Sequence, residues 1–430
     1  MARILVLGAY GLIGTACARA AEAAGHEVRR LGRSAAAARL AAPGADWVIA
    51  DMARMDVADW HAATEGCDAV VNAAGALQDG GRDDLEAVHA TAIDRLARAL
   101  AGRGVRLVQI SAVGASPDAD TDFMRSKARG DAHVRAMDGP WVILRPGLVI
   151  GPAAYGGTAL LRAAAALPVA PRPFACSPVQ TVALDDVARA AVLGATGAVP
   201  PATEADLVEP APRPLPEVIA RLRAWLGLPP PRLALVPPGW TMALAGHVGD
   251  ALSRLGWRPP LRTTALRVLA DGVTGDPAPW RAAGGPDCRP LDATLAALPA
   301  TVQERWFAKL WPLMPLAVAI LSAFWTLSGL IALLRPEAAA RVLTARGWPD
   351  GAAMAVVLGG AVLDVALGLA ILWRPAARAA CLGMAATAAA YLVGGTLGAP
   401  DLWADPLGPL TKVLPAIVLP LLTRALLEDR

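Results

Sequence analysis

Three glycines follow one another at intervals of three residues near the start of the chain, directly after a short apolar run. Residues 4–7 predict a buried strand, and an alanine-rich helix is expected after the last glycine. Glycine lets the backbone turn sharply and approach a pyrophosphate with no Cβ in the way, while the helix start supplies positive potential. The pattern therefore predicts a dinucleotide site. Its expected contacts in this loop are Gly8, Tyr10, Gly11, Leu12, Ile13 and Gly14.

The end of the second predicted strand carries the residues that would choose between NAD(H) and NADP(H). A site that prefers NAD places a carboxylate there, about 20 residues beyond the glycines, to bind the ribose hydroxyls. Here the position holds Gly32, and Arg33 follows it. Because a guanidinium suits a 2′-phosphate, NADP(H) is favoured over NAD(H). The alternative is that Arg33 is an ordinary solvated surface residue.

A parallel sheet is needed to bring such residues to one edge. Up to about residue 150, short apolar runs alternate with alanine-rich stretches, which is the pattern of a doubly wound parallel α/β sheet. The runs are residues 4–7, 27–31, 47–49, 69–72, 107–111 and 142–144. Asp51 and Met52 follow the third run and are expected at the adenine edge. Ala73, Ala74 and Gly75 follow the fourth run and are expected beneath the cofactor.

Taken together, these motifs resemble an extended or atypical short-chain dehydrogenase. The closest group is NmrA-like and includes the dinucleotide-binding accessory subunit of respiratory complex I. The resemblance rests on the glycine loop, Asp51, residues 72–75, Ser111, Lys127 and residues 144–147. It covers about residues 1–300 and implies an NAD(P)-binding Rossmann core at 1–150, followed at 151–302 by the rest of the module with a small substrate-side lobe. Residues 303–309 and 405–412 resemble the DoxX-like membrane domain that follows such modules, here 303–430.

One position departs from the pattern that the resemblance implies. Enzymes of this family use a Ser, a Tyr and a Lys four residues after the Tyr, so Ser111 and Lys127 are the expected catalytic residues. The Tyr position is Phe123, and a phenyl ring cannot donate or accept a proton. Tyr155 is the candidate substitute, while Lys127 can still hold the ribose of the cofactor. Cofactor binding is therefore expected to persist without standard alcohol–carbonyl chemistry.

The last third of the chain is strongly apolar. Four segments are expected to form a transmembrane four-helix bundle, about residues 312–334, 353–373, 379–398 and 407–423, with a buried helical core as the alternative. Arginines such as Arg374 and Arg424 favour a multi-pass protein of the cell (inner) membrane, with the Rossmann domain and both termini cytoplasmic. Asp364 in mid-span and Lys412, one turn into the last span, either pair with each other or serve a head group, a quinone or a partner helix. Snorkelling is the alternative for Lys412.

Composition excludes several other classes of protein. The net charge is +3 with the arginines scattered, which argues against nucleic acid as a partner. Five cysteines form no CxxC pair and five histidines form no HxxxH pair, so neither a disulfide framework nor a metal is expected. A mean hydropathy of +0.44 with 18% charged residues is too apolar for an ordinary soluble enzyme, and indicates the lipid bilayer as a partner.

Three functions remain open from the sequence. The first is a membrane-tethered oxidoreductase that prefers NADPH and reduces a quinone or another lipid-like carbonyl substrate by a non-standard mechanism. The second is a non-catalytic NADP(H)-binding redox sensor or assembly subunit, with a membrane-protein partner. The third, a sugar-nucleotide epimerase or dehydratase, ranks last because it needs the tyrosine that Phe123 replaces.

Overall fold

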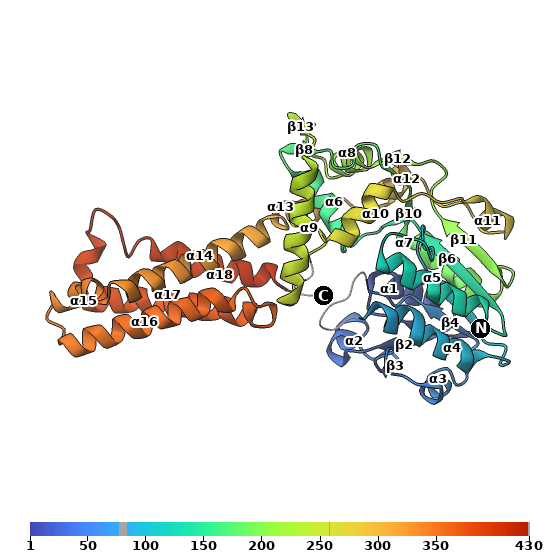
Figure 1. Ribbon diagram of the computed structural model, residues 1–430, viewed down its shortest axis with the longest axis horizontal. Coiled ribbons are helices and arrows are strands. Elements are labelled where there is room, and N and C mark those ends of the chain that lie inside the picture. The colour runs from blue at the N-terminus through green and yellow to red at the C-terminus, as the bar shows by residue number, and fades with distance from the viewer. Residues whose placement is uncertain (77–83, 258, 429–430) are drawn as a thin grey trace. The chain divides into compact units, whose positions relative to one another are not determined.

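The computed structural model describes residues 1–76, 84–257 and 259–428 of the chain (Figure 1). They form two compact units. The first comprises Met1–Ala251 and Pro259–Ala308, and the second comprises Leu252–Arg258 and Lys309–Arg430. Each unit is described by itself below.

A seven-stranded parallel sheet forms the centre of the first unit. Its strands, in spatial order, are β11 (Thr203–Leu207), β6 (Trp141–Pro146), β5 (Arg106–Ile110), β4 (Ala69–Asn72), β1 (Arg3–Leu7), β2 (Glu27–Gly32) and β3 (Trp47–Ile49). The strand order reverses at β1, which pairs with both β2 and β4. In such a sheet, ligands bind in the crevice at the carboxyl ends of the strands beside this reversal.

Helices cover both faces of the sheet (Figure 1). Because both of its faces are buried, the central strand β1 is nearly all apolar: Ile4 and Val6 belong to one core, and Leu5 and Leu7 to the other. The first core includes α1 (Leu12–Ala23) and α7 (Leu184–Thr196). The second includes α3 (Val57–Ala63), α4 (Ala92–Leu100), which continues a π-helical turn (Ala87–Thr91), and α5 (Asp122–Arg135). The short helix α2 (Ala35–Ala41) follows β2.

The rest of the first unit is a smaller lobe of short elements around its own core. Its strands form three two-stranded pairs: β7 (Leu148–Ile150) with β10 (Thr181–Ala183), β9 (Pro178–Val179) with β12 (Arg213–Pro214), and β8 (Val169–Pro171) with β13 (Leu233–Leu235). Its helices are α6 (Gly157–Ala166), α8 (Leu215–Trp225), α9 (Gly239–Arg254), α10 (Thr263–Asp271), α11 (Ala278–Ala282), α12 (Leu291–Ala297) and α13 (Val302–Leu310). This lobe falls in residues 151–302, where a small substrate-side lobe was expected.

The second unit is helical, with α14 packed along α16 and α17 along α18. Its helices are α14 (Leu313–Leu334), α15 (Pro336–Thr344), α16 (Asp350–Ala370), α17 (Arg374–Gly398), a 3-10 turn (Pro400–Trp403) and α18 (Val413–Leu426). Within the described residues, α14, α16 and α17 are long and apolar enough to span a membrane. The architecture thus confirms the predicted fold class, with a helical region roughly consistent with four bundle helices.

The last predicted span needs correction in its length and position. A span was expected at residues 407–423, but α18 begins at Val413 and has 14 residues, about 21 Å of helix against a hydrocarbon core of about 30 Å. Lys412 is therefore the exposed residue that precedes α18 and not a residue one turn inside it. Asp364 does not pair with it in the described structure: its carboxylate accepts a hydrogen bond of 2.8 Å from the Tyr391 hydroxyl.

Candidate functional site

The glycine loop joins the carboxyl end of β1 to the start of α1, beside β4. Gly8 has a φ of +65°, and a Cβ there would lie 2.8 Å from the Ala74 Cα. A Cβ on Gly14 would lie 2.3 Å from the Gly8 carbonyl oxygen. Gly11 is the N-cap of α1 and offers no side-chain cap, so the first-turn amides of Leu12 and Ile13 are left for an anion. This cradle, which any Cβ would fill, fits a pyrophosphate.

The aromatic ring of Tyr10, in the glycine loop, packs against the end of β2. Tyr10 stacks on Trp47 with 6.2 Å between ring centroids, and a Cβ on Gly32 would lie 2.4 Å from the Tyr10 ring. The position at which NAD-preferring sites carry an acid therefore has no room for a side chain. Arg33 follows as an exposed residue, and the Ser34 hydroxyl then caps α2 by accepting from the Ala37 amide.

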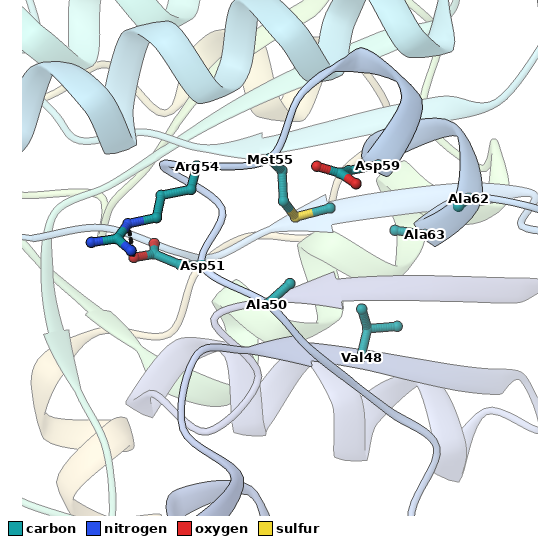
Figure 2. A pocket seen from close by; sticks show the side chains of 8 residues that line it. All are labelled: Val48, Ala50, Asp51, Arg54, Met55, Asp59, Ala62 and Ala63. Atoms are coloured by element: carbon teal, nitrogen blue, oxygen red, sulfur yellow. Dashed lines mark ion pairs between the residues drawn. The ribbon is translucent and has the colours of Figure 1, made fainter.

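Asp51 and Met52 lie beyond β3 and differ in what they can contact. The Met52 side chain is 7% exposed and belongs to the sheet core, so only its backbone can face a ligand. The Asp51 carboxylate accepts from the Ala53 amide and lies 3.8 Å from the Arg54 guanidinium. Figure 2 shows this ion pair at the rim of a hollow of about 460 Å³. Its lining residues are Val48, Ala50, Asp51, Arg54, Met55, Asp59, Ala62 and Ala63, none of them from the glycine loop.

The Asn72 side chain stabilises the turn after β4 through hydrogen bonds. Its side-chain amide donates to Gln109 on β5 at 2.7 Å, and its carbonyl oxygen accepts from the Ala74 amide at 3.1 Å. Ala73 and Ala74 thereby face the glycine loop through their backbones, since a Cβ on Gly8 would meet both. A Cβ on Gly75 would lie 3.1 Å from His89 Nε2 and 3.3 Å from Lys127 Nζ.

Lys127 and His89 form a buried polar pair under this turn. Lys127 Nζ donates to the Ile110 carbonyl at 3.0 Å. Burial lowers the pKa of Lys127 to about 8, although the negative charge of Asp131 acts to raise it. His89 Nε2 accepts from the Ala76 amide at 3.1 Å, so the proton sits on Nδ1, which lies 2.9 Å from the Ser126 hydroxyl. Burial, with the Lys127 charge nearby, lowers the pKa of His89 to about 2.

The two remaining catalytic positions face other partners. The Phe123 ring lies edge-on to His89 with 5.7 Å between centroids. The Ser111 hydroxyl donates to Asp131 at 2.8 Å, one helical turn beyond Lys127. Burial raises the pKa of the Asp131 carboxyl, opposed by the Ser111 hydrogen bond and by Arg145 at 3.5 Å. The hydrogen of the Ser111 hydroxyl is thus donated to a buried carboxylate.

Tyr155 lies on the loop before α6. Its side chain is 55% exposed, and its backbone amide and carbonyl both bond to the Thr158 hydroxyl. The loop is therefore fixed while the phenol faces solvent. Within residues 1–76, 84–257 and 259–428 there is also no group of three or more His, Cys, Asp or Glu residues placed to hold a metal.

The structure gathers most of the predicted residues at one edge of the sheet. Gly8, Gly14 and Ala74 touch across the loop, and Gly75 approaches Lys127. Sequence reasoning missed His89 and Asp131. Asp131 carried a signal, because it stands four residues after Lys127 and shares its helix face. His89 carried none, since its contacts to Ala76 and Ser126 are made across the fold.

Two regions of the chain match known families. Residues 8–192 match the NAD(P)H-binding family, and residues 322–421 match the DoxX-like family. No curated protein matches the chain.

Three solved structures show the same fold over the first two thirds of the chain. WbmH of Bordetella bronchiseptica, in complex with NAD+, is 18% identical, with a TM-score of 0.52 over 69% of this chain and 97% of that protein. The quinone oxidoreductase QOR2 of Escherichia coli, complexed with NADPH, is 18% identical, with a TM-score of 0.52 over 68% and 98%. The protein gox2253 is 21% identical, with a TM-score of 0.51 over 69% and 96%. The chain therefore carries an NAD(P)H-binding Rossmann domain followed by a DoxX-like domain.

Proposed function

We propose that this chain is an NADPH-dependent reductase of a quinone or quinone-like, membrane-soluble carbonyl compound. One observation carries the proposal: the chain combines a glycine loop that fits a pyrophosphate with a phenyl ring, Phe123, at the position where enzymes of the resembled family hold their tyrosine. Such a site favours an acceptor that needs no strong protein acid. A quinone is one, because accepting a hydride yields an aromatic phenolate that water can protonate, whereas an ordinary carbonyl would yield a basic alkoxide.

The roles of the protein's own residues follow from their surroundings. When bound, reduced nicotinamide supplies the hydride. Lys127 would bind the ribose hydroxyls, and with a pKa of about 8 it holds a proton at neutral pH that it can pass on. Neutral His89 fixes the turn at Ala76 and does not serve as an acid. The flat Phe123 ring offers a stacking surface to a planar substrate.

The preference for NADPH rests on the end of β2. Gly32 has no carboxylate and no space for one beneath Tyr10, and the exposed Arg33 that follows it would suit a 2′-phosphate. Asp51 would meet the adenine edge. The relative whose description names an NADPH-dependent quinone oxidoreductase makes the activity compatible with this fold, although at 18% identity the likeness is one of fold.

The apolar helices support action at a membrane. A quinone partitions into the bilayer, so a site tethered there meets a concentrated substrate. Positively charged turns such as that at Arg374, between α16 and α17, favour an inner-membrane protein whose Rossmann domain and termini face the cytoplasm.

A second candidate is a non-catalytic NADP(H) sensor or assembly subunit of a membrane complex. The commitment of the Ser111 hydroxyl to Asp131 favours it, because Ser111 and Phe123 together then offer a substrate no free acid. Of the expected hydroxyl donors, that of Tyr155 on its exposed loop would then remain. An epimerase or dehydratase ranks below both because its chemistry needs the missing tyrosine.

The test is NADPH oxidation by the full-length protein in nanodiscs with a panel of short-chain quinones. We expect steady, quinone-dependent oxidation that Phe123→Tyr retains, while Phe123→Tyr alone gains activity on simple aldehydes. Phe307→Tyr, at another phenylalanine of the chain, is the matched control and should leave both unchanged. Tight NADPH binding without oxidation by any quinone would reject the reductase and support the second candidate.

A further inference from the structure

Helix α9 turns an apolar face to solvent. Trp240, Leu244 and Val248 stand at intervals of four residues, so they share one side of the helix. Their exposed fractions are 69%, 56% and 49%. A helix of a soluble domain normally buries such a stripe, and here it is left uncovered.

The buried side of α9 shows that this orientation is fixed. Gly249 lies against the backbone of Leu261, where a Cβ would come within 2.0 Å of the carbonyl oxygen. Asp250 accepts from the Thr263 hydroxyl at 2.6 Å and from Arg262 Nε at 3.1 Å. The helix therefore packs through small and polar residues. It cannot rotate its large apolar side chains inward without breaking this contact.

The chain just before α9 extends the same kind of surface. Leu233 and Leu235 lie on the same side of β13, two residues apart, and Val236 follows; their exposed fractions are 67%, 58% and 63%. Large apolar side chains exposed at several neighbouring positions of the chain are typical of interaction sites. We call the set of Leu233, Leu235, Val236, Trp240, Leu244 and Val248 the α9 face.

The continuation of α9 indicates what covers this face. The short segment that follows Ala251, Leu252–Arg258, belongs to the helical unit that contains the apolar spans. Within that unit, Leu255 accepts from the Arg374 amide at 3.0 Å and Trp257 Nε1 donates to the Leu372 carbonyl at 2.6 Å. Leu372 and Arg374 lie at the turn between spans α16 and α17, where a membrane protein meets the head groups.

The stretch of chain between the α9 face and the helical unit is short, and the residues beside the face suit a lipid surface. Val248 stands only four residues before Leu252, the first residue of the helical unit, so the covalent link keeps the two close. Exposed Arg232 borders the α9 face at its N-terminal end, which suits anionic head groups. Trp240 has the ring type that concentrates at membrane interfaces.

We propose that the α9 face binds the surface of the lipid bilayer directly, so that the NAD(P)H-binding domain is held on the membrane by its own surface as well as by the covalent link to the spans. The partner is the lipid itself, with apolar side chains entering the head-group boundary. The proposal is independent of which substrate the domain reduces.

Full-length protein in nanodiscs of phosphatidylcholine and phosphatidylglycerol tests this. In a Cys176→Ser background, which removes the exposed cysteine, an environment-sensitive dye is attached at Leu244→Cys. The matched control is Leu40→Cys, 78% exposed on α2 of the same unit. We expect blue-shifted emission and at least twofold quenching by spin-labelled lipid at position 244, with neither at position 40. Equal, unquenched emission at both positions would overturn the proposal.

Two further outcomes are informative. Blue-shifted emission at position 244 without lipid quenching would mean that protein, such as a second copy of the chain, covers the face, and would also overturn the proposal. A triple variant, Trp240→Ser, Leu244→Ser and Val248→Ser, changes only exposed side chains and should fold. With the dye moved to Val236→Cys, it should lose the lipid quenching while the protein stays in the nanodisc through its spans.

Discussion

The glycine end of the site and its Lys127 end are built from opposite kinds of residue. At the glycine end, backbone lies against backbone: Gly8 and Gly14 have no side chains, Ala74 packs against Gly8, and Gly14 packs against the Gly8 carbonyl. At the other end, buried polar side chains form hydrogen bonds: Lys127 donates to the Ile110 carbonyl, and Ser111 donates to Asp131. The structure of the glycine end depends on glycines that have no side chain, whereas that of the Lys127 end depends on buried charged and polar groups.

This contrast shows that binding and proton transfer depend on separate residues. A phenyl ring at position 123 removes an acid without touching the glycine loop, so the cradle survives the loss of standard chemistry. Substitutions at the two ends should therefore have separable effects on cofactor binding and on protonation.

Gly14→Ala should nearly abolish cofactor binding. The new Cβ would stand 2.3 Å from the Gly8 carbonyl oxygen, so the loop must move off the position that fits a pyrophosphate. We expect NADPH affinity to fall roughly 100-fold, about 2.7 kcal/mol, in a fluorescence titration. Gly157→Ala, with nothing within 4 Å of its Cβ, should bind as the parent does. Unchanged affinity in Gly14→Ala would place the dinucleotide elsewhere.

His89 should make the protein acid-sensitive. Its pKa is about 2 when folded and 6.5 as a free side chain, so the unfolded chain binds one more proton between these values. Stability is therefore lost as pH falls below 6.5, by about 1.4 kcal/mol per pH unit, or about 2 kcal/mol at pH 5. The difference in thermal stability between pH 7.5 and pH 5 should be smaller in His89→Gln than in the parent protein. The exposed control His133→Gln should behave like the parent.

Arg33→Ala should change cofactor preference without ending binding. If Arg33 meets the 2′-phosphate, NADPH affinity should fall about tenfold, or about 1.4 kcal/mol, while NADH affinity changes less than twofold. Arg54→Ala, at the rim of the Asp51 hollow, is the control and should weaken both cofactors equally or neither. An equal loss of both cofactors in Arg33→Ala would contradict the assignment.

The elements that sequence predicted best were those set by local pattern. The strands at residues 4–7, 47–49 and 69–72 appear with these bounds or one residue longer. Residues 4–7 and 69–72 are buried on both faces and are therefore continuous apolar runs, while residues 47–49 form a short, partly exposed edge strand. The edge strand β11 was missed, since Thr203–Leu207 alternates polar and apolar residues beside a proline cluster. Its neighbour β6 pairs with it across 61 residues of sequence, from Val142 to Thr203, which no local pattern encodes.

The polar contacts of the site were less predictable for the same reason. Ser111 was expected to face the substrate, and nothing in its immediate sequence shows that Asp131, 20 residues away, receives its hydroxyl. His89 meets Ser126 across 37 residues. In the helical unit, the last span was expected to start at residue 407, but the structure starts α18 at Val413, after the turn at Gly408.

The smallest effect expected is a pH dependence of NADPH binding at Lys127. Burial lowers the Lys127 pKa to about 8, so the ammonium that would hold the ribose is charged at pH 7 and loses its proton as pH rises through 8. The anionic cofactor should therefore bind about threefold more weakly at pH 9 than at pH 7, since part of a charge-assisted hydrogen bond is lost. Lys127→Met should bind weakly at both pH values, with a flat profile, whereas Lys309→Met should keep the parent's slope. A parent profile that is flat from pH 7 to pH 9 would mean that Lys127 does not touch the cofactor, and that its hydrogen bond to Ile110 serves only to close the end of β5.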